Sequence, residues 1–555
     1  MLGKTKPLWV DYLFLITVLG SLFLINLGNR PFSSPDEGRY TEIPREMVQS
    51  GDYLTPHLNG LKYFEKPPFV YWLETLPLKL GFSSEFAMRL PIALFALLGC
   101  LSVYAYARRV YSRSAGLLSS IILGTSILYF ALGRLILLDL VLGVFLSIGL
   151  FSFIIGIKLC IGKERRIHLG FASAAFACAV LTKGLIGLVL PIAIIGIWVI
   201  GLNKWKDLFP LYLPTNLLIF FGIALPWHIL VSMQNPEFFD FYFIHEHFER
   251  YLTTVHRRFQ PFWFFIPIFI IGFFPWIFFL PKAIKNFIPK KMKDWKIYDL
   301  EAFLIIWSLF IVFFFSFSSS KLIPYILPIF PPMAIIVGRF LAYVIESEKS
   351  TKIEAILYFI VSTALSFGIP FVLQERNDPD LFKSLTPYFF PIKVYLITGS
   401  SLFLIFSFLE KLKKRRFWAL ILFHVLFLFT INETGTFVQK MSMKPFAKYI
   451  KKNISEETKI VFYNMYAQDL PFYLNKTVKI LDWSGELDFG KKIDPKNSTF
   501  LTREKFTNLW KAEKNMCVIS KKNFIPGIPF SGKIPPILLE KEEYVLLCKK
   551  SDERL

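Results

Sequence analysis

Two adjacent acids near the start of the chain, Asp36 and Glu37, are the first residues whose types suggest chemistry. They lie in SSPDEGRY, directly after a long apolar run. Arg39 follows Asp36 by three residues, so on a helix both side chains would face the same cleft. A proline followed by acids is also an ordinary helix start, where carboxylates satisfy the positive end of the helix dipole. The segment therefore predicts either a helix start or a catalytic acid beside a cation.

A second group, KYFEKPP, lies in the same polar segment and contains Tyr63, Glu65 and Lys66. The two prolines stiffen the chain and bias Lys66 toward an extended backbone. A lysine held at a fixed place near a membrane surface suits contact with a phosphate group. A surface ion pair or a lipid-headgroup contact would explain the same residues.

Two further groups interrupt or border apolar runs. Asp139 lies inside RLILLDLVLG, and an uncompensated carboxylate in a membrane costs about 3 kcal/mol, so such an acid usually faces a polar cavity. Pairing with the nearby Arg134 would give Asp139 a purely structural role. In SSSKLIPYILP, Lys321 and Tyr325 lie four residues apart, and the prolines suit a backbone that lines a cavity. A Lys/Tyr anchor at the membrane interface is the structural alternative.

The last group is FIHEHFERY, which contains His245, His247 and Arg250. A histidine together with a carboxylate such as Glu65 could bind zinc, although the spacing is not that of a closed structural zinc site. An amphipathic helix at the membrane interface explains the pattern equally well.

The composition indicates the kind of scaffold that must position these groups. Hydrophobic residues make up 54% of the 555 residues and charged residues only 19%. This excludes a disordered chain, a collagen-like fibre and an ordinary soluble enzyme, and it predicts a polytopic α-helical membrane protein. The five cysteines exclude a disulfide scaffold, and none forms a CxxC pair. The net charge of +22 is attributed to cytoplasmic loops, so no nucleic-acid partner is expected.

About thirteen apolar runs are long enough to be membrane helices. They are 8–28, 86–107, 115–133, 135–157, 168–182, 184–202, 208–232, 262–281, 301–317, 322–345, 353–374, 386–409 and 416–432. With a cytoplasmic N-terminus, the short inner loops hold about 24 Lys and Arg in about 65 positions, against about 14 in about 105 outside. The positive-inside rule therefore predicts a cytoplasmic N-terminus, and the odd helix number predicts an external C-terminus. The first run lacks an A-x-A cleavage site and is expected to be an uncleaved anchor.

Three longer external segments remain, 29–85, 233–261 and 433–555. In the first, PPFVYWLETLPLKL predicts a helix lying at the membrane interface. The third alternates predicted strands with helices, as in a small α/β domain. Cys517 and Cys548 fall on two of these strands, and a disulfide between them is one possibility. We therefore expect a membrane domain over 1–432, which includes the first two segments, and an external α/β domain over 433–555.

All five groups map to the external side of this topology. Cations that bind phosphates, together with carboxylates for acid–base, positioning or metal roles, suit chemistry on a phosphate-bearing lipid. A lipid transporter or flippase would also explain the helix number and the intramembrane acid, but not the external segments. In an enzyme, Asp36, Lys66, Asp139, Arg250 and Tyr325 must converge on one outer cavity, whereas a transporter would line a path to the inner face.

Together these motifs resemble the lipid A aminoarabinose transferases. They are the DE pair after the first helix, YFEKPP, an Asp in the fourth helix, H-x-x-x-x-R before the eighth and K-x-x-x-Y at the tenth. The resemblance implies a GT-C fold, shared with protein O-mannosyltransferases, with about 13 transmembrane helices, juxtamembrane helices in the first loop and a C-terminal periplasmic α/β domain. It implies transfer of 4-amino-4-deoxy-L-arabinose, or a related sugar, from undecaprenyl phosphate to a lipid A phosphate at the bacterial inner membrane. A protein hydroxyl or another glycan remains possible as acceptor.

The resemblance also implies residue roles. Asp36 would be the principal catalytic acid, with Glu37 beside it and Asp139 in support. The donor phosphate would be held by Lys66, Arg250, Tyr325, Tyr63, Arg39 and Lys321. Glu65 and His245, or alternatively His247, would bind a divalent metal, with zinc expected. The expected partners are the donor lipid and lipid A, the protein is expected to act as a monomer, and masking of lipid A charge would give polymyxin resistance.

Overall fold

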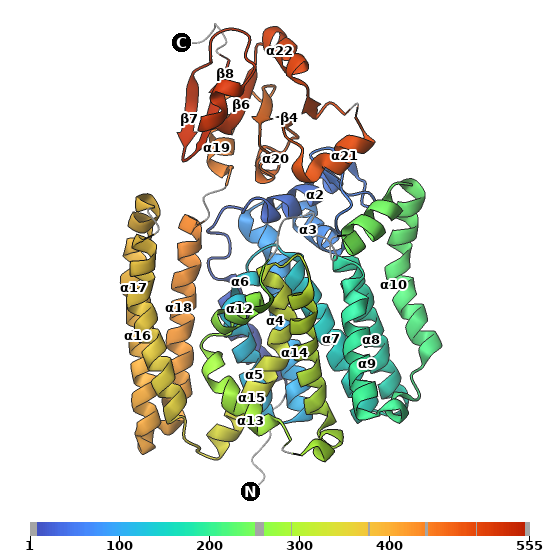
Figure 1. The fold of residues 1–555 in the computed structure, drawn as a ribbon, viewed down its shortest axis with the longest axis vertical. Helices are drawn as coiled ribbons and strands as arrows, with labels where there is room; N and C mark the ends of the chain where they lie inside the picture. The colour runs from blue at the N-terminus through green and yellow to red at the C-terminus, as the bar shows by residue number, and fades with distance from the viewer. Residues whose placement is uncertain are drawn as a thin grey trace. The chain divides into compact units, whose positions relative to one another are not determined.

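The computed structural model describes residues 8–249, 260–289, 291–375, 378–438, 442–495 and 497–549. Its internal contacts divide the chain into two compact units (Figure 1). We call Met1–Asn29 with Arg89–Val438 the helical unit, and Arg30–Met88 with Gln439–Leu555 the mixed unit. The structure thus groups the first predicted external segment with the C-terminal segment, whereas the sequence analysis assigned 29–85 to the membrane domain.

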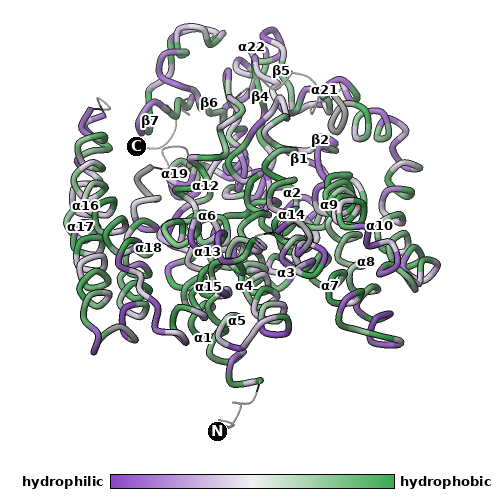
Figure 2. The backbone as a smooth tube through the Cα atoms, turned by 60° about the horizontal axis from the view of Figure 1, so that its bottom comes forward, coloured by the Kyte–Doolittle hydropathy of each residue, from purple (hydrophilic) through white to green (hydrophobic). Residues whose placement is uncertain are grey.

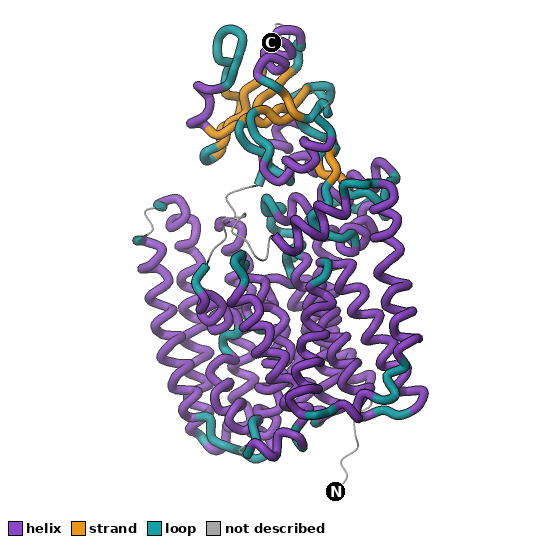
Figure 3. Tube along the Cα trace, turned by 45° about the vertical axis from the view of Figure 1, so that its right-hand side comes forward, coloured by secondary structure: helices purple, strands orange, loops and turns teal. Residues whose placement is uncertain are grey.

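The helical unit is built from helices and their connections. Its α-helices are α1 (Leu8–Leu24), α4 (Glu85–Val110), α5 (Arg113–Thr125), α6 (Ile127–Leu132), α7 (Leu138–Leu159), α8 (Gly162–Lys183), α9 (Ile186–Leu202), α10 (Leu213–Gln234), α12 (Phe265–Gly272), α13 (Leu280–Phe287), α14 (Asp299–Phe317), α15 (Phe330–Glu346), α16 (Lys352–Gln374), α17 (Pro379–Phe408) and α18 (Arg416–Val438). Shorter helical turns are η1 (Trp205–Leu208), η2 (Asp240–Glu249), η3 (Phe262–Phe264), η4 (Trp276–Phe279), η5 (Met292–Lys296), η6 (Ile323–Ile329) and η7 (Glu410–Arg415). Every strand of the described chain belongs to the mixed unit (Figure 3).

Hydrophobic residues run along the helices of this unit (Figure 2). Within the described ranges, eight helices are long and apolar enough to cross a membrane, or nine if the bent pair Phe262–Gly272 and Trp276–Phe287 forms one span. Each of the thirteen predicted runs overlaps a helical segment, and the run 115–133 is covered by α5 and α6, which break at Ser126. The chain is therefore a multi-pass membrane protein, while thirteen crossings stays a prediction.

Arg134 shows how this unit satisfies the polar groups that it buries. Its side chain is buried and donates hydrogen bonds to the carbonyl oxygens of Leu22, Phe23 and Ile25 at 3.0, 2.7 and 2.6 Å. The last carbonyls of a helix lack partners within the helix, and in a membrane water cannot supply them. Arg134 also donates to Asn432 on α18 at 3.1 Å. It therefore fastens the end of α1 to α18.

The mixed unit combines the helices of the first external segment with a sheet. Its elements are α2 (Asp36–Ser50), β1 (His57–Leu58), β2 (Leu61–Lys62), α3 (Phe69–Lys79), α19 (Lys444–Asn453), β3 (Lys459–Tyr463), α20 (Asp469–Leu474), β4 (Lys479–Leu481), η8 (Gly485–Leu487), α21 (Asp488–Ile493), β5 (Phe500–Leu501), α22 (Arg503–Ala512), β6 (Met516–Lys521), η9 (Lys522–Gly527), β7 (Ile537–Lys541) and β8 (Tyr544–Cys548). The larger described sheet has the order β5-β4-β3-β6-β8-β7. Strands β5, β4, β3 and β6 are parallel, and β8 pairs antiparallel with both β6 and β7. The predicted α/β domain is confirmed.

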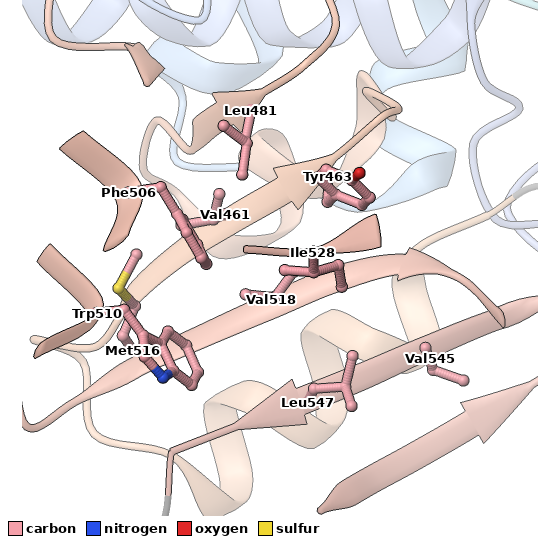
Figure 4. Packing of buried hydrophobic residues seen from close by; sticks show 10 residues of the cluster. All are labelled: Val461, Tyr463, Leu481, Phe506, Trp510, Met516, Val518, Ile528, Val545 and Leu547. Atoms are coloured by element: carbon pink, nitrogen blue, oxygen red, sulfur yellow. The ribbon is translucent and has the colours of Figure 1, made fainter. Parts of the chain in front are cut away.

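One face of this sheet forms a hydrophobic core with α22 (Figure 4). Residues paired directly across neighbouring strands share a face of the sheet. Val461 pairs with Val518, and Val518 pairs with Leu547, so all three project to the same side. Phe506 and Trp510 of α22 pack against them, with their rings stacked at 5.8 Å.

A disulfide links the two neighbouring strands β6 and β8. It joins Cys517 to Cys548, which are directly opposite each other in the strand pairing. The sequence had left this pairing open, and the structure assigns it.

A β-hairpin fastens the first segment to this sheet. Asn59 and Gly60 form the turn between β1 and β2, with φ of 55° and 77°, which suits a two-residue hairpin turn of Asn-Gly. The Asn59 side chain donates to the carbonyl oxygen of Val478 and accepts from its N–H, both at 2.9 Å. Because Val478 directly precedes β4, the hairpin pairs with the start of a sheet strand through one side chain.

Helix α2 lies at the opposite, carboxyl edge of the parallel strands. The segments that follow β3 and β4, namely α20 and η8, both contact α2: the backbone of α20 reaches Gly38, and Glu486 of η8 pairs with Arg39. Many α/β domains bind ligands at this edge. Here the chain's own helix occupies it, and that helix carries Asp36 and Arg39.

Candidate active site

Asp36 and Arg39 lie on the same face of α2, as their spacing predicts. Asp36 is the first residue of the helix, and 53% of its side chain is exposed. An Arg39 nitrogen lies 3.4 Å from the Asp36 carboxylate, at the long end of the range for a hydrogen bond. The acid therefore remains accessible and only weakly engaged by its neighbour.

The main partner of Arg39 is Glu486, a residue of η8 that the sequence analysis missed. Only 11% of the Arg39 side chain and 13% of the Glu486 side chain are exposed. Glu486 also accepts a hydrogen bond from Gln468. Burial raises the pKa of Glu486, the Arg39 charge opposes that rise, and the nearby Glu65 carboxylate adds to it. No local signal distinguishes Glu486 from other acids of the polar C-terminal segment.

Aromatic residues surround the Arg39 guanidinium. Its central carbon lies 5.6 Å from the ring centre of Tyr40 and 5.9 Å from that of Tyr63. The Nε of Arg39 and the hydroxyls of Tyr63 and Tyr71 are buried, and within the described chain they have no hydrogen-bond partner. Burial raises the pKa of both Tyr63 and Tyr71, so the phenols stay protonated and keep their donors. These are unused donors beside a cation, an arrangement that suits an anionic group.

Glu37 lies in a buried environment, unlike the exposed Asp36. It is buried, and its carboxylate accepts hydrogen bonds from the N–H and hydroxyl of Ser33, both at 3.0 Å. Glu74 of α3 is also buried, and burial, with the Glu37 carboxylate nearby, raises its pKa. These contacts favour the helix-start interpretation for Glu37, and its predicted catalytic role stays a prediction.

Glu65 and Lys66 lie between β2 and α3, and both are half-buried. The Lys66 ammonium donates to the Glu65 carbonyl oxygen. The Glu65 carboxylate is close enough to Arg39 and Glu486 to act on both electrostatically. Glu65 therefore belongs to the same cluster as Arg39, Tyr63 and Glu486, which we call the Arg39 group.

A second group forms in the helical unit around Asp139. Asp139 lies in the first turn of α7 and pairs with Lys183, the last residue of α8, at 2.5 Å. The Lys183 ammonium also lies 4.5 Å from the ring centre of Tyr325 in η6. An acid and a lysine that meet inside a membrane compensate each other's charge. Lys183 lies between the predicted apolar runs 168–182 and 184–202 and was given no role from the sequence, although a lone lysine between two apolar runs was itself a signal.

Lys321 has a different environment from Tyr325. Its ammonium is buried and donates to the carbonyl oxygens of Gln260 at 2.9 Å and Ser318 at 2.7 Å. These carbonyls lie outside regular helices and need donors. The contacts favour an anchoring role for Lys321, and its predicted phosphate contact stays a prediction.

The predicted histidine segment is only partly described. Arg250 lies outside the described residues, as do the side chains of His245 and His247. Among the described residues, Glu65 belongs to no group of three candidate metal ligands. Within the described part of the chain, the one such group is Cys160, Glu164 and His168. It surrounds the Arg109 guanidinium, which contacts all three. Because that cation already neutralises the group, we assign no metal to it.

Comparisons with known proteins match both parts of the chain. Residues 10–242 match the family model described as dolichyl-phosphate-mannose-protein mannosyltransferase. Residues 446–529 match the aminoarabinose transferase C-terminal domain. An undecaprenyl phosphate-alpha-4-amino-4-deoxy-L-arabinose arabinosyl transferase from Edwardsiella ictaluri (strain 93-146) is 31% identical over 365 residues. That match spans 65% of this chain and 65% of the relative, slightly less than two thirds of its length.

Solved structures match over nearly the full length. The apo crystal structure of ArnT from Cupriavidus metallidurans superposes with a TM-score of 0.84 and 26% identity, over 98% of each chain. The structure of the same protein bound to undecaprenyl phosphate gives a TM-score of 0.80 and 25% identity, over 99% of each chain. These matches confirm the predicted fold class.

Proposed function

We propose that the chain belongs to the aminoarabinose transferase family of GT-C membrane glycosyltransferases and transfers 4-amino-4-deoxy-L-arabinose from undecaprenyl phosphate to a lipid A phosphate. The full-length structural similarity to an aminoarabinose transferase, together with the matched C-terminal domain, is the observation that carries the proposal. The protein is a multi-pass protein of the inner membrane. We further propose a cytoplasmic N-terminus, with the mixed unit on the periplasmic side.

The leaving group of this reaction is a polyprenyl phosphate, whose developing negative charge requires cations. The mixed unit supplies Arg39 and Lys66, with the unused hydroxyls of Tyr63 and Tyr71 as further donors. In the helical unit, taken by itself, Lys183 is a further cation beside Asp139 and Tyr325. The Arg250 contact carries over from the sequence resemblance as a proposal. The sugar carbon would pass through an oxocarbenium-like transition state, as in other glycosyl transfers.

The acceptor requires little help with deprotonation. A phosphate monoester has a second pKa of about 6 and is largely ionised at neutral pH. Asp36 is exposed and only loosely held by Arg39, so it can orient the acceptor or the sugar amine. A hydroxyl acceptor would instead need a general base, and Asp36 would have to supply it.

We also propose Glu65 as a ligand of a divalent metal, with His245 as the second ligand implied by the sequence. A half-buried carboxylate suits zinc or another divalent ion, and a bound ion would add Lewis-acid stabilisation of phosphate charge. Arg39, which pairs with Glu486 beside Glu65, also supplies positive charge to this cluster, in addition to that of a bound ion.

Reconstitution of the purified full-length protein with the lipid-linked donor and lipid A tests the proposal. Mass spectrometry should show an aminopentose added to lipid A, and Asp36→Asn and Lys66→Ala should each lower the rate at least about 100-fold. Glu504→Gln and Lys505→Ala are matched controls, because both residues are exposed on α22, and they should leave the rate unchanged. No transfer to lipid A by the wild type, with transfer to a peptide hydroxyl instead, would contradict the acceptor and favour the mannosyltransferase-like alternative.

A further inference from the structure

Asp469 is a fully buried acid that the mechanism above does not use. It is the first residue of α20, and its side chain has no exposed surface. One carboxylate oxygen accepts a hydrogen bond from the Ser34 hydroxyl at 2.7 Å. The other accepts from the Ser442 hydroxyl at 3.0 Å and from the Met443 N–H at 2.7 Å. One carboxylate therefore joins three separate parts of the mixed unit: the segment before α2, the segment before α19, and α20 itself.

The donors around Asp469 explain why a carboxylate suits this position. Burial raises the pKa of Asp469 to about 6, while the bonds from Ser34, Met443 and Ser442 act to lower it. Retaining a charge in a buried site is unfavourable unless donors surround it. An asparagine of the same size has one accepting oxygen, so its amide nitrogen would replace an acceptor and the Met443 N–H or a serine would lose its partner. The site is thus built for an acceptor with two oxygens.

The bond to Ser34 acts on the part of α2 that carries the proposed chemistry. Ser34 lies two residues before Asp36. Gly38 approaches α20 so closely that an added Cβ would lie 2.5 Å from the Asp469 nitrogen and 2.8 Å from the Gln468 carbonyl carbon. The start of α20 therefore contacts this part of α2 in two ways, through the Ser34–Asp469 hydrogen bond and through close packing against Gly38.

The residue before Asp469 extends this contact to Arg39. Gln468 donates to Glu486, and Glu486 pairs with Arg39. The segment that follows β3 thus fixes the turn bearing Asp36 through Asp469, and the orientation of Arg39 through Gln468 and Glu486.

We propose that Asp469 is a positioning residue for the transfer reaction, which aligns Asp36 by holding Ser34 at the carboxyl edge of the sheet. The C-terminal α/β domain is then an integral part of the catalytic unit. This inference rests on the proposed function. A misplacement of about 1 Å at a reacting group can lower a rate about 100-fold, so a remote hydrogen bond of this kind can control catalysis.

Two serine variants separate positioning from simple stabilisation. Ser34→Ala and Ser442→Ala each remove one hydroxyl from the same carboxylate, but only Ser34 adjoins α2. We expect both to lower the melting temperature by a similar, small amount. We expect Ser34→Ala to lower kcat about tenfold, with KM for the donor changed less than about twofold, and Ser442→Ala to leave kcat unchanged. Asp469→Asn should lower kcat at least as much as Ser34→Ala, and combining the two should add little.

Hydrogen exchange supplies a readout that does not depend on activity. Amides 36–40 should exchange faster in Ser34→Ala than in the wild type, and at the wild-type rate in Ser442→Ala. Equal kcat in the two serine variants, or faster exchange of α2 in both, would overturn the positioning role. An inactive wild type that still shows the selective exchange in Ser34→Ala would instead contradict the proposed function and leave the structural link intact.

Discussion

Arg39 of the first external segment forms its ion pair with Glu486 of the C-terminal domain, within one compact unit. The pair is largely buried and lies beside Tyr63 and Glu65, residues of the conspicuous KYFEKPP motif. The C-terminal domain therefore positions Arg39, a residue that the sequence predicts for phosphate binding, although Glu486 itself lies in no recognisable motif.

Replacing Glu486 by glutamine should impair both stability and donor binding. Removing one partner of a buried pair leaves the other charge uncompensated, which costs about 3 kcal/mol. We expect a lower melting temperature and a KM for the lipid-linked donor raised about tenfold, because Arg39 is free to reorient. Glu513→Gln is the control, since its pair with Lys459 is partly exposed and should contribute less than about 1 kcal/mol. If Glu486→Gln left the KM for the donor unchanged, the Arg39–Glu486 pair would have no role in binding the donor phosphate.

The pairing of Lys183 with Asp139 predicts strong coupling between the two residues. Lys183→Met should lower kcat about 100-fold and reduce the amount of folded protein, because it leaves an uncompensated acid in the membrane. The double variant Lys183→Met/Asp139→Asn should recover folded protein while remaining inactive. The measurement is a double-mutant cycle on both melting temperature and kcat. Additive effects on folded protein would mean that the two groups do not interact.

Asp469 predicts a pH dependence of stability with a defined sign. Its pKa is raised from 3.8 to about 6 in the folded state, so between these values the folded protein binds more protons than the unfolded one. Stability should therefore fall as the pH rises from about 4 to about 6, by an amount on the order of 3 kcal/mol, and then level off. Asp469→Asn should remove this component. The check is the difference in melting temperature between wild type and variant across pH 4 to 8, where a constant difference would argue against the raised pKa.

The Cys517–Cys548 disulfide predicts both stability and location. The 31-residue separation corresponds to a stabilisation of about 4 kcal/mol. Cys517→Ser/Cys548→Ser should therefore lower the stability of the domain, whereas Cys178→Ser, a free cysteine in α8, should not. Because disulfides persist in the oxidising periplasm, thiol mass-tagging in cells should label these two cysteines only after reduction. Labelling without reduction would contradict the periplasmic placement.

The proposed metal predicts a change in ion content. The purified wild type should contain about one divalent ion per chain by elemental analysis, and Glu65→Ala should retain clearly less. Glu486→Gln serves as a control of similar location, since it removes a neighbouring carboxylate that is already paired with Arg39. Equal ion content in Glu65→Ala and wild type would exclude Glu65 as a ligand.

The sequence alone was sufficient for the features that depend on local patterns. Apolar runs of membrane length mark the helices, alternating strands mark the α/β domain, and a three-residue spacing places Asp36 and Arg39 on one face. Each follows from the geometry of a single helix or strand, which neighbouring residues determine.

Only the tertiary structure decided which distant residues meet. Lys183 reaches Asp139 because α7 and α8 are neighbouring helices, so the end of one lies beside the start of the other. Glu486 and Asp469 reach α2 because parallel strands β3 and β4 end at the same edge of the sheet. Such pairs depend on how whole elements pack. The local sequence around an isolated acid in a polar segment does not identify its partner. The grouping of the first external segment with the C-terminal domain has the same cause, since it rests on contacts between residues far apart in the chain.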